Sequence, residues 1–284
     1  MLEKYISPLT INGITLDYKK ETIVMGILNV TPDSFSDGGK YNNVEAAVAQ
    51  AKKMVAEGAK IIDVGGESTR PGYTRISDED EIARIVPVIQ ALVAEVPAVI
   101  SIDTYKANVA RAAIEAGAHI INDIWGAKAE PEIAKVAAEL HVPIILMHNR
   151  ENTDYGLDFW TTARTDLENS IAIAHGAGVP DSHIILDPGI GFAKTTEQNI
   201  KMMQHLNDLV TMGYPVLLAT SRKSMIGNVL KLPVEERIEG TSATVVYGIE
   251  KGCHIIRVHD VQEMARATQM TDVLVGKRTY KEEA

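Results

Sequence analysis

The sequence predicts an α/β fold, a single (β/α)8 (TIM) barrel preceded by a β-hairpin, and two observations predict it. Short apolar runs rich in β-branched residues alternate eight times with segments of helical periodicity. Runs without polar alternation are typical of parallel strands that are buried on both faces. No linker or change of composition divides the 284 residues, so we expect one domain over residues 1–284. Uninterrupted alternation favours a closed barrel over the alternative, an open doubly wound sheet.

Residues 8–18 are expected to form the hairpin, before the first strand of the barrel. Asn12-Gly13 lies between two short runs that each contain apolar residues. Asn-Gly is the preferred pair in two-residue hairpin turns, because both positions require a positive φ. We expect this hairpin to close the lower end of the barrel as a plug.

Eight apolar runs are expected to be the strands of the barrel. The runs cover residues 23–28, 61–64, 98–102, 120–121, 143–147, 183–186, 215–219 and 255–258. The segments between them carry apolar residues at helical spacing, which predicts one amphipathic helix over residues 44–55 and another over 82–93. Ser77 and Asp80 predict a capping box at the start of the second helix. A third helix is predicted over residues 197–212 and is ended by Gly213.

Composition and charge exclude several classes of protein. The chain is 45% hydrophobic and has a formal net charge of −10, which argues against nucleic acid or an anionic membrane surface as a partner. Cys253 is the single cysteine, so no internal disulfide forms and a reducing compartment is expected. The N-terminus lacks a signal-peptide pattern and the most apolar stretch, 82–102, contains charges and prolines. We therefore expect a cytoplasmic protein with no membrane span.

Polar residues follow each of the predicted strands. In a barrel the carboxyl ends of all strands meet at one mouth, where such enzymes place their chemistry. One polar residue after a strand usually belongs to a turn or a helix cap, and we favour that interpretation for Asp123 and His148 taken alone. The convergence of all eight strand ends predicts a site. Its members are Asn29, residues 67–70, Asp103, Asn122, Asp187, Arg222, Lys223, Arg257 and His259.

The predicted mouth carries acceptors on one side and cations on the other. Asp103, Asn122 and Asp187 supply carboxylates and an amide. The cationic side consists of Arg70, Arg222, Lys223, Arg257 and His259. This division suits a ligand that combines a donor-rich heterocycle with an anionic tail, although the whole chain is acidic.

Two segments resemble the signatures of the dihydropteroate synthases, a family of pterin-binding barrels. Residues 24–39 (VMGILNVTPDSFSDGG) resemble the first signature and residues 58–71 (GAKIIDVGGESTRP) the second. Each is a long, non-repetitive match, and further matches follow in order at residues 121–123, 186–192, 221–224 and 257–260. Residues 149–160 are the stretch to which the resemblance assigns least.

The resemblance implies an activity, a cofactor and partners. Such enzymes are transferases that condense 6-hydroxymethyl-7,8-dihydropterin diphosphate with p-aminobenzoate, giving 7,8-dihydropteroate and pyrophosphate in folate biosynthesis. They use Mg²⁺, form homodimers and are targets of sulfonamides. The expected chemistry is substitution at the exocyclic methylene of the pterin. It needs charge stabilisation of the leaving diphosphate and no strong base, because the arylamine is largely neutral at pH 7.

The resemblance also implies roles for individual residues. The pterin is expected to contact Asp103, Asn122, Asp187 and Lys223. The diphosphate is expected near Asn29, Arg257 and His259, with Asn29 as the Mg²⁺ position. The p-aminobenzoate pocket is expected to consist of Phe192, Lys223 and Ser224. Two mobile loops are also implied: residues 31–39 form the first, and the second contains Thr69, Arg70 and Pro71. The implied substrate-binding set also includes Thr69, Arg70, Pro71 and Val258. The expected catalytic residues are Lys223, Arg257 and His259.

Structural alternatives remain open for several of these residues. Asp63 and residues 65–66 are interpreted as packing and turn residues, and Phe192 could belong to the core. Asp33 could form an Asx-turn without any catalytic role. Cys253 is expected to be a small buried hydrophobic residue. Arg257 could instead pair with a nearby carboxylate such as Asp260, with His259 only capping the next helix.

Two other functions remain as alternatives. A pterin-binding methyltransferase would share the pterin residues but should lack the two long signature segments. A non-catalytic pterin-binding paralogue is disfavoured because Asn29, Lys223, Arg257 and His259 are all present.

Overall fold

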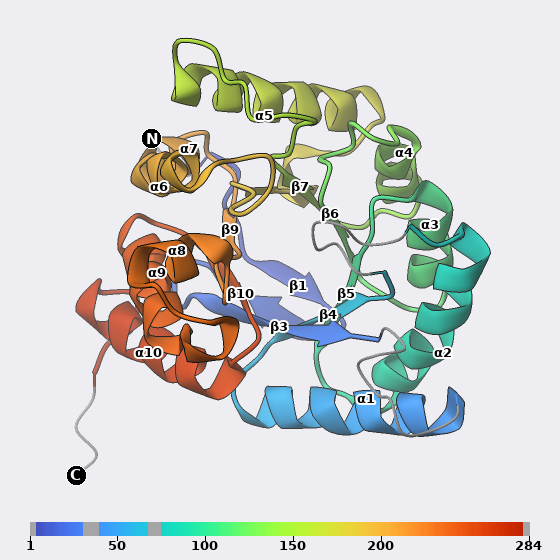
Figure 1. Cartoon of the computed structure of the whole chain (residues 1–284). Helices are drawn as coiled ribbons and strands as arrows, with labels where there is room; N and C mark the ends of the chain where they lie inside the picture. The colour runs from blue at the N-terminus through green and yellow to red at the C-terminus, as the bar shows by residue number, and fades with distance from the viewer. Residues whose placement is uncertain (1–3, 31–39, 68–74, 281–284) are drawn as a thin grey trace.

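A parallel eight-stranded sheet forms the centre of the part of the chain that the computed structural model describes, residues 4–30, 40–67 and 75–280 (Figure 1). Only the backbone is described for residues 40–42. The sheet order is β8-β7-β6-β5-β4-β3-β10-β9. The strands are β3 (Ile23–Asn29), β4 (Ile61–Gly65), β5 (Val99–Asp103), β6 (Ile120–Asp123), β7 (Ile144–Met147), β8 (Ile184–Asp187), β9 (Leu217–Leu218) and β10 (Ile255–Val258).

The two edge strands of this order meet and close the barrel. Leu186 in β8 pairs with Val216 just before β9, and its amide donates to the Pro215 carbonyl at 2.9 Å. The predicted (β/α)8 barrel is therefore confirmed. The predicted strand over residues 215–219 is shorter than expected, because only Leu217–Leu218 pair as a regular strand.

A ring of helices surrounds the sheet (Figure 1). The helices are α1 (Lys40–Ala56), α2 (Asp78–Glu95), α3 (Ala107–Glu115), α4 (Glu132–Glu139), α5 (Phe159–Gly176), α6 (Thr196–Gln204), α7 (Leu206–Val210), α8 (Ser224–Leu230), α9 (Ile238–Glu250) and α10 (Val261–Leu274). Two 3-10 turns, Asp181–His183 and Val234–Glu236, lie between them. Ser77 caps α2, since its hydroxyl accepts from the Asp80 amide at 3.1 Å, which is one of the two bonds of the predicted capping box.

The third predicted helix is divided at His205 into α6 and α7, so the expectation of one helix over residues 197–212 is wrong. His205 has φ −91° and ψ 10°, outside the helical region, and its Nδ1 pairs with the Asp208 carboxylate at 2.7 Å. Gly213 ends the pair with φ +91°, as predicted for a glycine at this position.

The N-terminal hairpin consists of β1 (Leu9–Ile11) and β2 (Ile14–Leu16), paired antiparallel. Asn12 and Gly13 both have positive φ, 50° and 75°, so the predicted turn is confirmed. Leu9, Ile11 and Ile14 pack against a core cluster that includes the inward-facing residues near the start of the barrel strands. The hairpin therefore closes the lower end of the barrel, as expected.

Side chains alternate between the barrel interior and the outer core. The first inward-facing layer is apolar and takes residues from all eight strands: Ile23, Met25, Ile61, Val99, Ile120, Ile145, Ile185, Leu217 and Ile255. Their outward-facing neighbours, such as Ile62, Ile100 and Ile256, pack in the core cluster that also contains the helices. Because the period of a strand is two, the residues two positions after the apolar layer point into the same interior, nearer the mouth.

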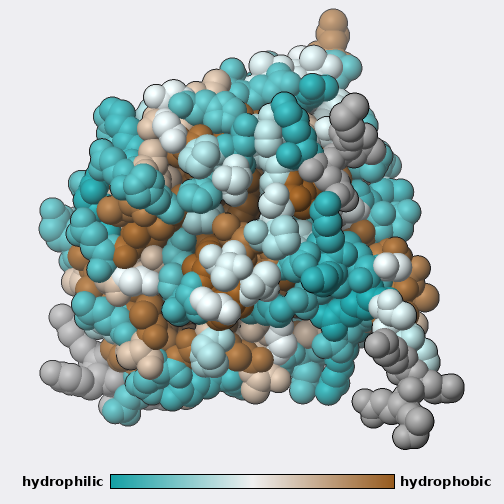
Figure 2. Space-filling view, turned by 180° about the vertical axis from the view of Figure 1, so that it is seen from behind, coloured by the Kyte–Doolittle hydropathy of each residue, from teal (hydrophilic) through white to brown (hydrophobic). Residues whose placement is uncertain are grey.

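One face of the molecule is mostly hydrophilic. Figure 2 shows that hydrophobic side chains on the face opposite to Figure 1 lie in separate patches among hydrophilic ones. Within the described residues, every helix is too short or too polar to cross a membrane.

Candidate active site

A polar cavity lies directly above the apolar layer of the barrel. It is lined by Asp103, Asn122, Ile124, Met147, Asp187, Ile190, Phe192, Ala219, Lys223 and Arg257. Asn122, Met147, Asp187, Ala219 and Arg257 each stand two positions after a residue of the apolar layer. Strand parity therefore accounts for the convergence. Six residues predicted for the site line this cavity, from Asp103 on β5 to Arg257 on β10.

Arg257 is the centre of an ion-paired network inside the barrel. Its Nε lies 2.6 Å from Asp63 Oδ2, and its Nη2 lies 2.6 Å from Asp103 Oδ2. Asp260 instead pairs with Arg222, whose Nε lies 2.9 Å from Asp260 Oδ2. The alternative that Arg257 pairs with a carboxylate is therefore confirmed, but its partners are Asp63 and Asp103 and not Asp260. The two bonds of Arg257 use two of the five guanidinium N–H donors, so others are left for a ligand.

Asp63 was assigned only to packing, and the structure corrects that interpretation. Its side chain is fully buried, and Oδ2 accepts from both Arg257 Nε and Asn122 Nδ2, the latter at 3.0 Å. Since the Asn122 NH₂ group faces Asp63, its carbonyl oxygen is the end left for a ligand. The signal in the sequence was parity, because Asp63 stands two positions after Ile61 and so faces the interior.

Burial raises the pKa of two carboxyl groups that line the cavity, Asp103 and Asp187. For Asp103 burial dominates, the Arg257 charge opposes it and the Asp63 charge adds to it. Burial also raises the pKa of Asp187 to about 6, although the Gly189 amide and the charges of Lys223 and Arg257 act in the opposite direction. Asp63 Oδ1 and Asp103 Oδ1 are buried without a hydrogen-bond partner among the described residues. The site therefore holds acceptors that are poorly satisfied by the protein itself.

Lys223 and Phe192 form the other wall of the cavity. Lys223 Nζ lies 4.5 Å from the centroid of the Phe192 ring, a cation–π contact. Burial lowers the pKa of Lys223 to about 8, and the Arg257 charge acts in the same direction. Ser224, the next residue, begins α8 and is exposed, outside the lining of the cavity.

His259 is held by Ser221, which was not predicted as a site residue. The Ser221 hydroxyl lies 2.9 Å from His259 Nδ1 and accepts from the His259 amide at 3.1 Å. When the Ser221 hydroxyl donates to Nδ1, Nε2 carries the ring proton and can donate to a ligand. Burial and the charges of Arg257 and Arg222 lower the pKa of His259 to about 4. The expectation of a cationic His259 is thus corrected, as is the alternative that its side chain only caps α10.

The remaining predicted residues are Asn29 near the mouth, Val258 in the outer core, and a group that the structure does not describe. Asn29 ends β3 with an exposed side chain, and a Cβ added at Gly65 would lie 3.5 Å from Asn29 Oδ1 and 3.9 Å from Asp103 Oδ2. Asn29 thus borders the same mouth. Val258 was predicted with the substrate residues, but its side chain is fully buried in the outer core. Thr69, Arg70, Pro71, Asp33 and residues 31–39 lie outside the described residues.

The buried carboxylates at the strand ends differ in the hydrogen bonds that their oxygens accept. Asp123 accepts from the Trp125 amide at 2.8 Å and the Ala127 amide at 2.6 Å, so it shapes a turn, as its interpretation taken alone predicts. Asp187 accepts from the Gly189 amide at 2.6 Å and also lines the cavity. Cys253 is buried and its pKa is raised to about 12 by burial, in agreement with a packing role.

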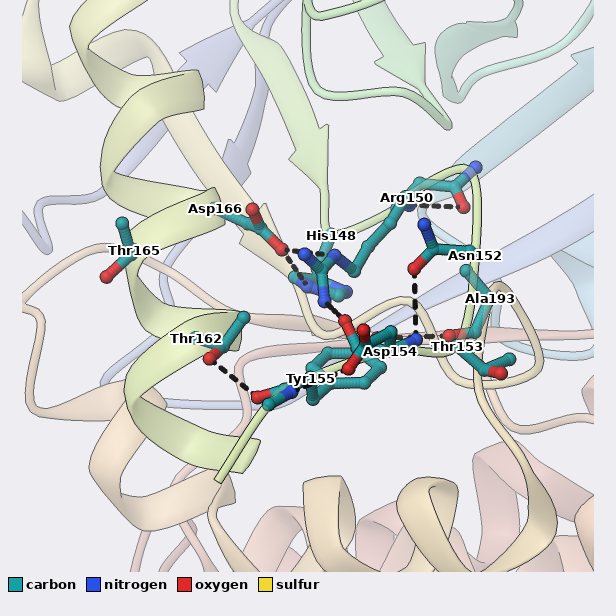
Figure 3. Close-up of polar contacts among 12 residues, drawn as sticks. His148, Arg150, Asn152, Thr153, Asp154, Tyr155, Thr162, Thr165, Asp166 and Ala193 are labelled. Carbon is teal, nitrogen blue, oxygen red and sulfur yellow. Dashed lines mark hydrogen bonds and ion pairs between the residues drawn. The ribbon is translucent and has the colours of Figure 1, made fainter. Parts of the chain in front are cut away.

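Residues 149–160, to which the sequence assigned no role, pack beside the loop that follows β8. In Figure 3 the His148 ring and the Arg150 side chain both point at Asp166, which projects from α5. His148 Nε2 lies 3.2 Å and Arg150 Nε 3.1 Å from Asp166 Oδ2. The Tyr155 hydroxyl donates to the Ala193 carbonyl at 3.1 Å, so this segment contacts the loop next to Phe192.

Comparisons with known proteins agree with this geometry. A model of the pterin binding enzyme family matches residues 25–259. The dihydropteroate synthase of Bacillus subtilis (strain 168) is 57% identical over 262 residues, covering 92% of each chain. A dihydropteroate synthase structure from Clostridium difficile, determined in the presence of pteroic acid, has a TM-score of 0.89 at 48% identity and covers 91% of this chain and 98% of its own. A Yersinia pestis dihydropteroate synthase in complex with a sulfonamide drug has a TM-score of 0.87 at 40% identity, covering 96% of this chain and 100% of its own.

Proposed function

Because the chain belongs to the dihydropteroate synthase family of pterin-binding enzymes, we propose that it makes 7,8-dihydropteroate for folate biosynthesis. The substrates are 6-hydroxymethyl-7,8-dihydropterin diphosphate and p-aminobenzoate, and pyrophosphate is released. One observation of the structure supports this most directly. The free carbonyl of Asn122, the carboxylate of Asp187 and the amine of Lys223 surround one small cavity in the barrel mouth.

Recognition of the pterin follows from the acceptors and the amine that line the cavity. The aminopyrimidinone edge of a pterin presents adjacent N–H donors, and one carboxylate can accept two of them as a pair. Asp187 is placed for this role, and Asn122 offers its carbonyl oxygen to a further ring N–H. Lys223 supplies donors for the ring carbonyl and nitrogens.

The diphosphate is placed by the guanidinium of Arg257 and the neutral ring of His259. Arg257 retains N–H donors beyond those used by Asp63 and Asp103, and His259 offers Nε2–H. As the carbon–oxygen bond breaks, negative charge grows on the departing diphosphate, so these donors stabilise the transition state more than the ground state. The methylene carbon that is left is captured by the amine of p-aminobenzoate. The Phe192 ring and Lys223 provide the pocket for this substrate, and the exposed Ser224, next to Lys223 in the chain, is proposed as a further contact outside the cavity lining.

Mg²⁺ is part of the proposal, with Asn29 as the protein residue that contacts it. Mg²⁺ usually keeps several waters and binds to proteins through one or two oxygen ligands together with substrate phosphates. The exposed amide oxygen of Asn29 beside Asp103 fits such a partial ligand set. Within the described residues no cluster of three or more His, Cys, Asp or Glu side chains could hold a metal alone. The bound ion would supply charge neutralisation of the diphosphate.

A homodimer is proposed as the assembly. Large hydrophobic side chains are exposed on the neighbouring helices α9 and α10, including Val246, Tyr247, Met270 and Leu274, the last of which is 71% exposed. A second copy of the chain would cover this surface. The cytoplasm is the proposed compartment, because the single buried cysteine needs no oxidising environment.

A pyrophosphate-release assay with both substrates tests the proposed function. Release that requires the pterin diphosphate, p-aminobenzoate and Mg²⁺ together is the expected result, and inhibition by a sulfonamide should follow. No release in the presence of tight pterin binding would instead identify a non-catalytic pterin-binding protein. Methyl transfer to or from a folate would identify a pterin-binding methyltransferase.

A further inference from the structure

Lys194 lies behind the wall of the cavity and does not line it. Its Nζ lies 2.8 Å from His148 Nδ1, 2.9 Å from the Gly189 carbonyl oxygen and 3.1 Å from the Phe192 carbonyl oxygen. Three acceptors match the three N–H donors of an ammonium group. Two of these acceptors belong to the turn between β8 and α6, which carries Phe192 at the cavity.

The hydrogen bonds around Lys194 define the state of His148. Because the Asp166 carboxylate can only accept, His148 Nε2 carries the ring proton, and in the neutral ring Nδ1 is then the acceptor that faces Lys194 Nζ. Burial lowers the pKa of His148 to about 4, so the neutral ring is the form present near pH 7. Asp166, His148 and Lys194 therefore form one chain of hydrogen bonds that ends on two carbonyl groups of the turn (Figure 3 shows the His148 and Asp166 part).

The turn held by Lys194 fixes residues that line the cavity. The Gly189 amide donates to Asp187 Oδ1 at 2.6 Å, so the position of Gly189, whose carbonyl Lys194 holds, orients the Asp187 carboxylate. Gly191 lies against the Lys223 side chain, since a Cβ there would be 3.0 Å from Lys223 Cδ. The Phe192 ring contacts Lys223 Nζ. Movement of the two carbonyls would therefore disturb the pterin side and the p-aminobenzoate side together.

Burying a lysine amine destabilises the folded protein, which argues against a purely structural role for Lys194. Burial lowers the pKa of Lys194 to about 7. Asp187 and Asp166 oppose this change, and Lys128 and Lys223 add to it. Keeping an amine in this position costs free energy that a hydrophobic side chain would not cost.

We propose that Lys194 is a positioning residue for both organic substrates. It holds the Gly189 and Phe192 carbonyls so that Asp187 and Phe192 are preorganised, and His148 orients it. The inference rests on the proposed function only for the identity of the ligands. The diphosphate end of the site, at Asn29, Arg257 and His259, has no bond to this chain of residues in the described structure.

The test is Lys194→Met, which keeps the length of the side chain and removes its donors. We expect the Kd of 6-hydroxymethylpterin and the KM of p-aminobenzoate to rise by about ten-fold or more, the change typical of losing a charge-assisted hydrogen bond. Turnover at saturating substrate and the Kd of Mg²⁺-pyrophosphate should stay within about three-fold. A variant that merely misfolds lowers the active fraction, and so the apparent kcat, without changing the Kd or KM of the folded molecules.

Lys128→Met is the matched control. Lys128 is a half-buried lysine of the same cluster that donates to a backbone carbonyl, but this carbonyl belongs to Asn149 and not to the turn. Its pterin Kd should stay within about two-fold of wild type. Unchanged Kd and KM in Lys194→Met, or an equal rise in the Lys128 control, would overturn the proposal. Because pterin binding is measured directly, this result is independent of whether the wild type releases pyrophosphate.

A second pair of variants tests the orienting role of His148. His148→Asn keeps an acceptor near the position of Nδ1, toward Lys194, whereas His148→Gln keeps a donor near Nε2, toward Asp166. Both remove the ring, so both lose similar packing. We expect the asparagine variant to retain pterin affinity better than the glutamine variant. Equal losses, or the opposite order, would show that His148 does not act through Lys194.

Discussion

Replacement of Asp187 by Asn should move stability and pterin affinity in opposite directions. Asp187 is 3% exposed and its pKa is raised from 3.8 to about 6, chiefly by burial. A shift of about two units corresponds to roughly 3 kcal/mol that the folded protein loses by keeping this carboxylate ionised at neutral pH. Asparagine removes that cost and can still accept from the Gly189 amide through its Oδ1.

The sign of the pH dependence follows from the raised pKa. Between about pH 4 and pH 6 the unfolded chain has already released this proton while the folded protein still holds it. The contribution of Asp187 to stability is therefore fully present below pH 4 and is lost as the pH rises to about 6. Above pH 6 we expect the unfolding free energy of Asp187→Asn to equal or exceed that of the wild type, by at most about 3 kcal/mol.

Pterin affinity should fall in the same variant. An amide presents one acceptor and one NH₂ group where the pterin edge needs two acceptors. The loss of a charge-assisted bond in a buried site is about 1.5–3 kcal/mol, or roughly ten- to a hundred-fold in Kd. Calorimetry with the pterin substrate and urea unfolding at pH 5 and pH 8 measure both quantities on one protein.

Asp123→Asn is the control for this prediction. Asp123 is also a buried strand-end carboxylate whose pKa burial raises to about 6, but its oxygens accept from the Trp125 and Ala127 amides and it does not line the cavity. Its pterin Kd should not change. An unchanged Kd in Asp187→Asn, or a stability loss above pH 6 as large as a typical core substitution, would refute the reasoning about Asp187.

Three further predictions concern the rest of the site. Arg257→Ala should lower the unfolding free energy by about 3–5 kcal/mol, because Asp63 and Asp103 lose their buried partner. The same variant should bind pyrophosphate more weakly. Urea unfolding measures the stability and calorimetry the affinity, and no change in either quantity would contradict the prediction. Gly189→Ala should cost about 2–5 kcal/mol, since its φ is +65° and its Cβ would lie 1.9 Å from the His148 carbonyl oxygen. The control Gly156→Ala, with φ +62° and no atom within 4 Å, should lose only about 1–2 kcal/mol in the same unfolding assay. Removal of Mg²⁺ by EDTA should weaken pyrophosphate binding and leave the affinity for 6-hydroxymethylpterin unchanged, and equal weakening of both would place the ion at the ring.

The strands were predictable because they are buried on both faces. Polar and apolar residues therefore do not alternate in their sequences, and each strand is an apolar run. The short β9 was predicted too long, because Pro215 has no amide to donate and pairing is regular only over Leu217–Leu218. The break at His205 was not predictable from periodicity. It arises where the backbone leaves the helical region, and apolar residues continue at helical spacing on both sides of it.

The members of the site were predictable, but their partners were not. Arg257 pairs with Asp63, which lies 194 positions earlier in the chain, and with Asp103, which lies 154 positions earlier. No local pattern in the sequence encodes such a pairing. Asp63 was taken for packing because a single carboxylate within an apolar run carries no sign of the cation that faces it. The contribution of His148 and residues 149–160 lies in contacts with the turn after β8, so motif comparison alone assigned them nothing.

The layering of the barrel explains why the chemistry lies where it does. The lower interior layer is wholly apolar, and the next residues of the same parity include Asp63, Asn122, Asp187 and Arg257. Placed above that layer, Asp103 and Asp187 have raised pKa values and Lys223 has a lowered one, because burial disfavours the charged form of each. A ligand with paired N–H donors at one end and an anionic tail at the other offsets both effects. The free energy that the fold loses by holding these groups apart from water is thus recovered when such a ligand binds, which is how a preorganised site gains affinity and selectivity together.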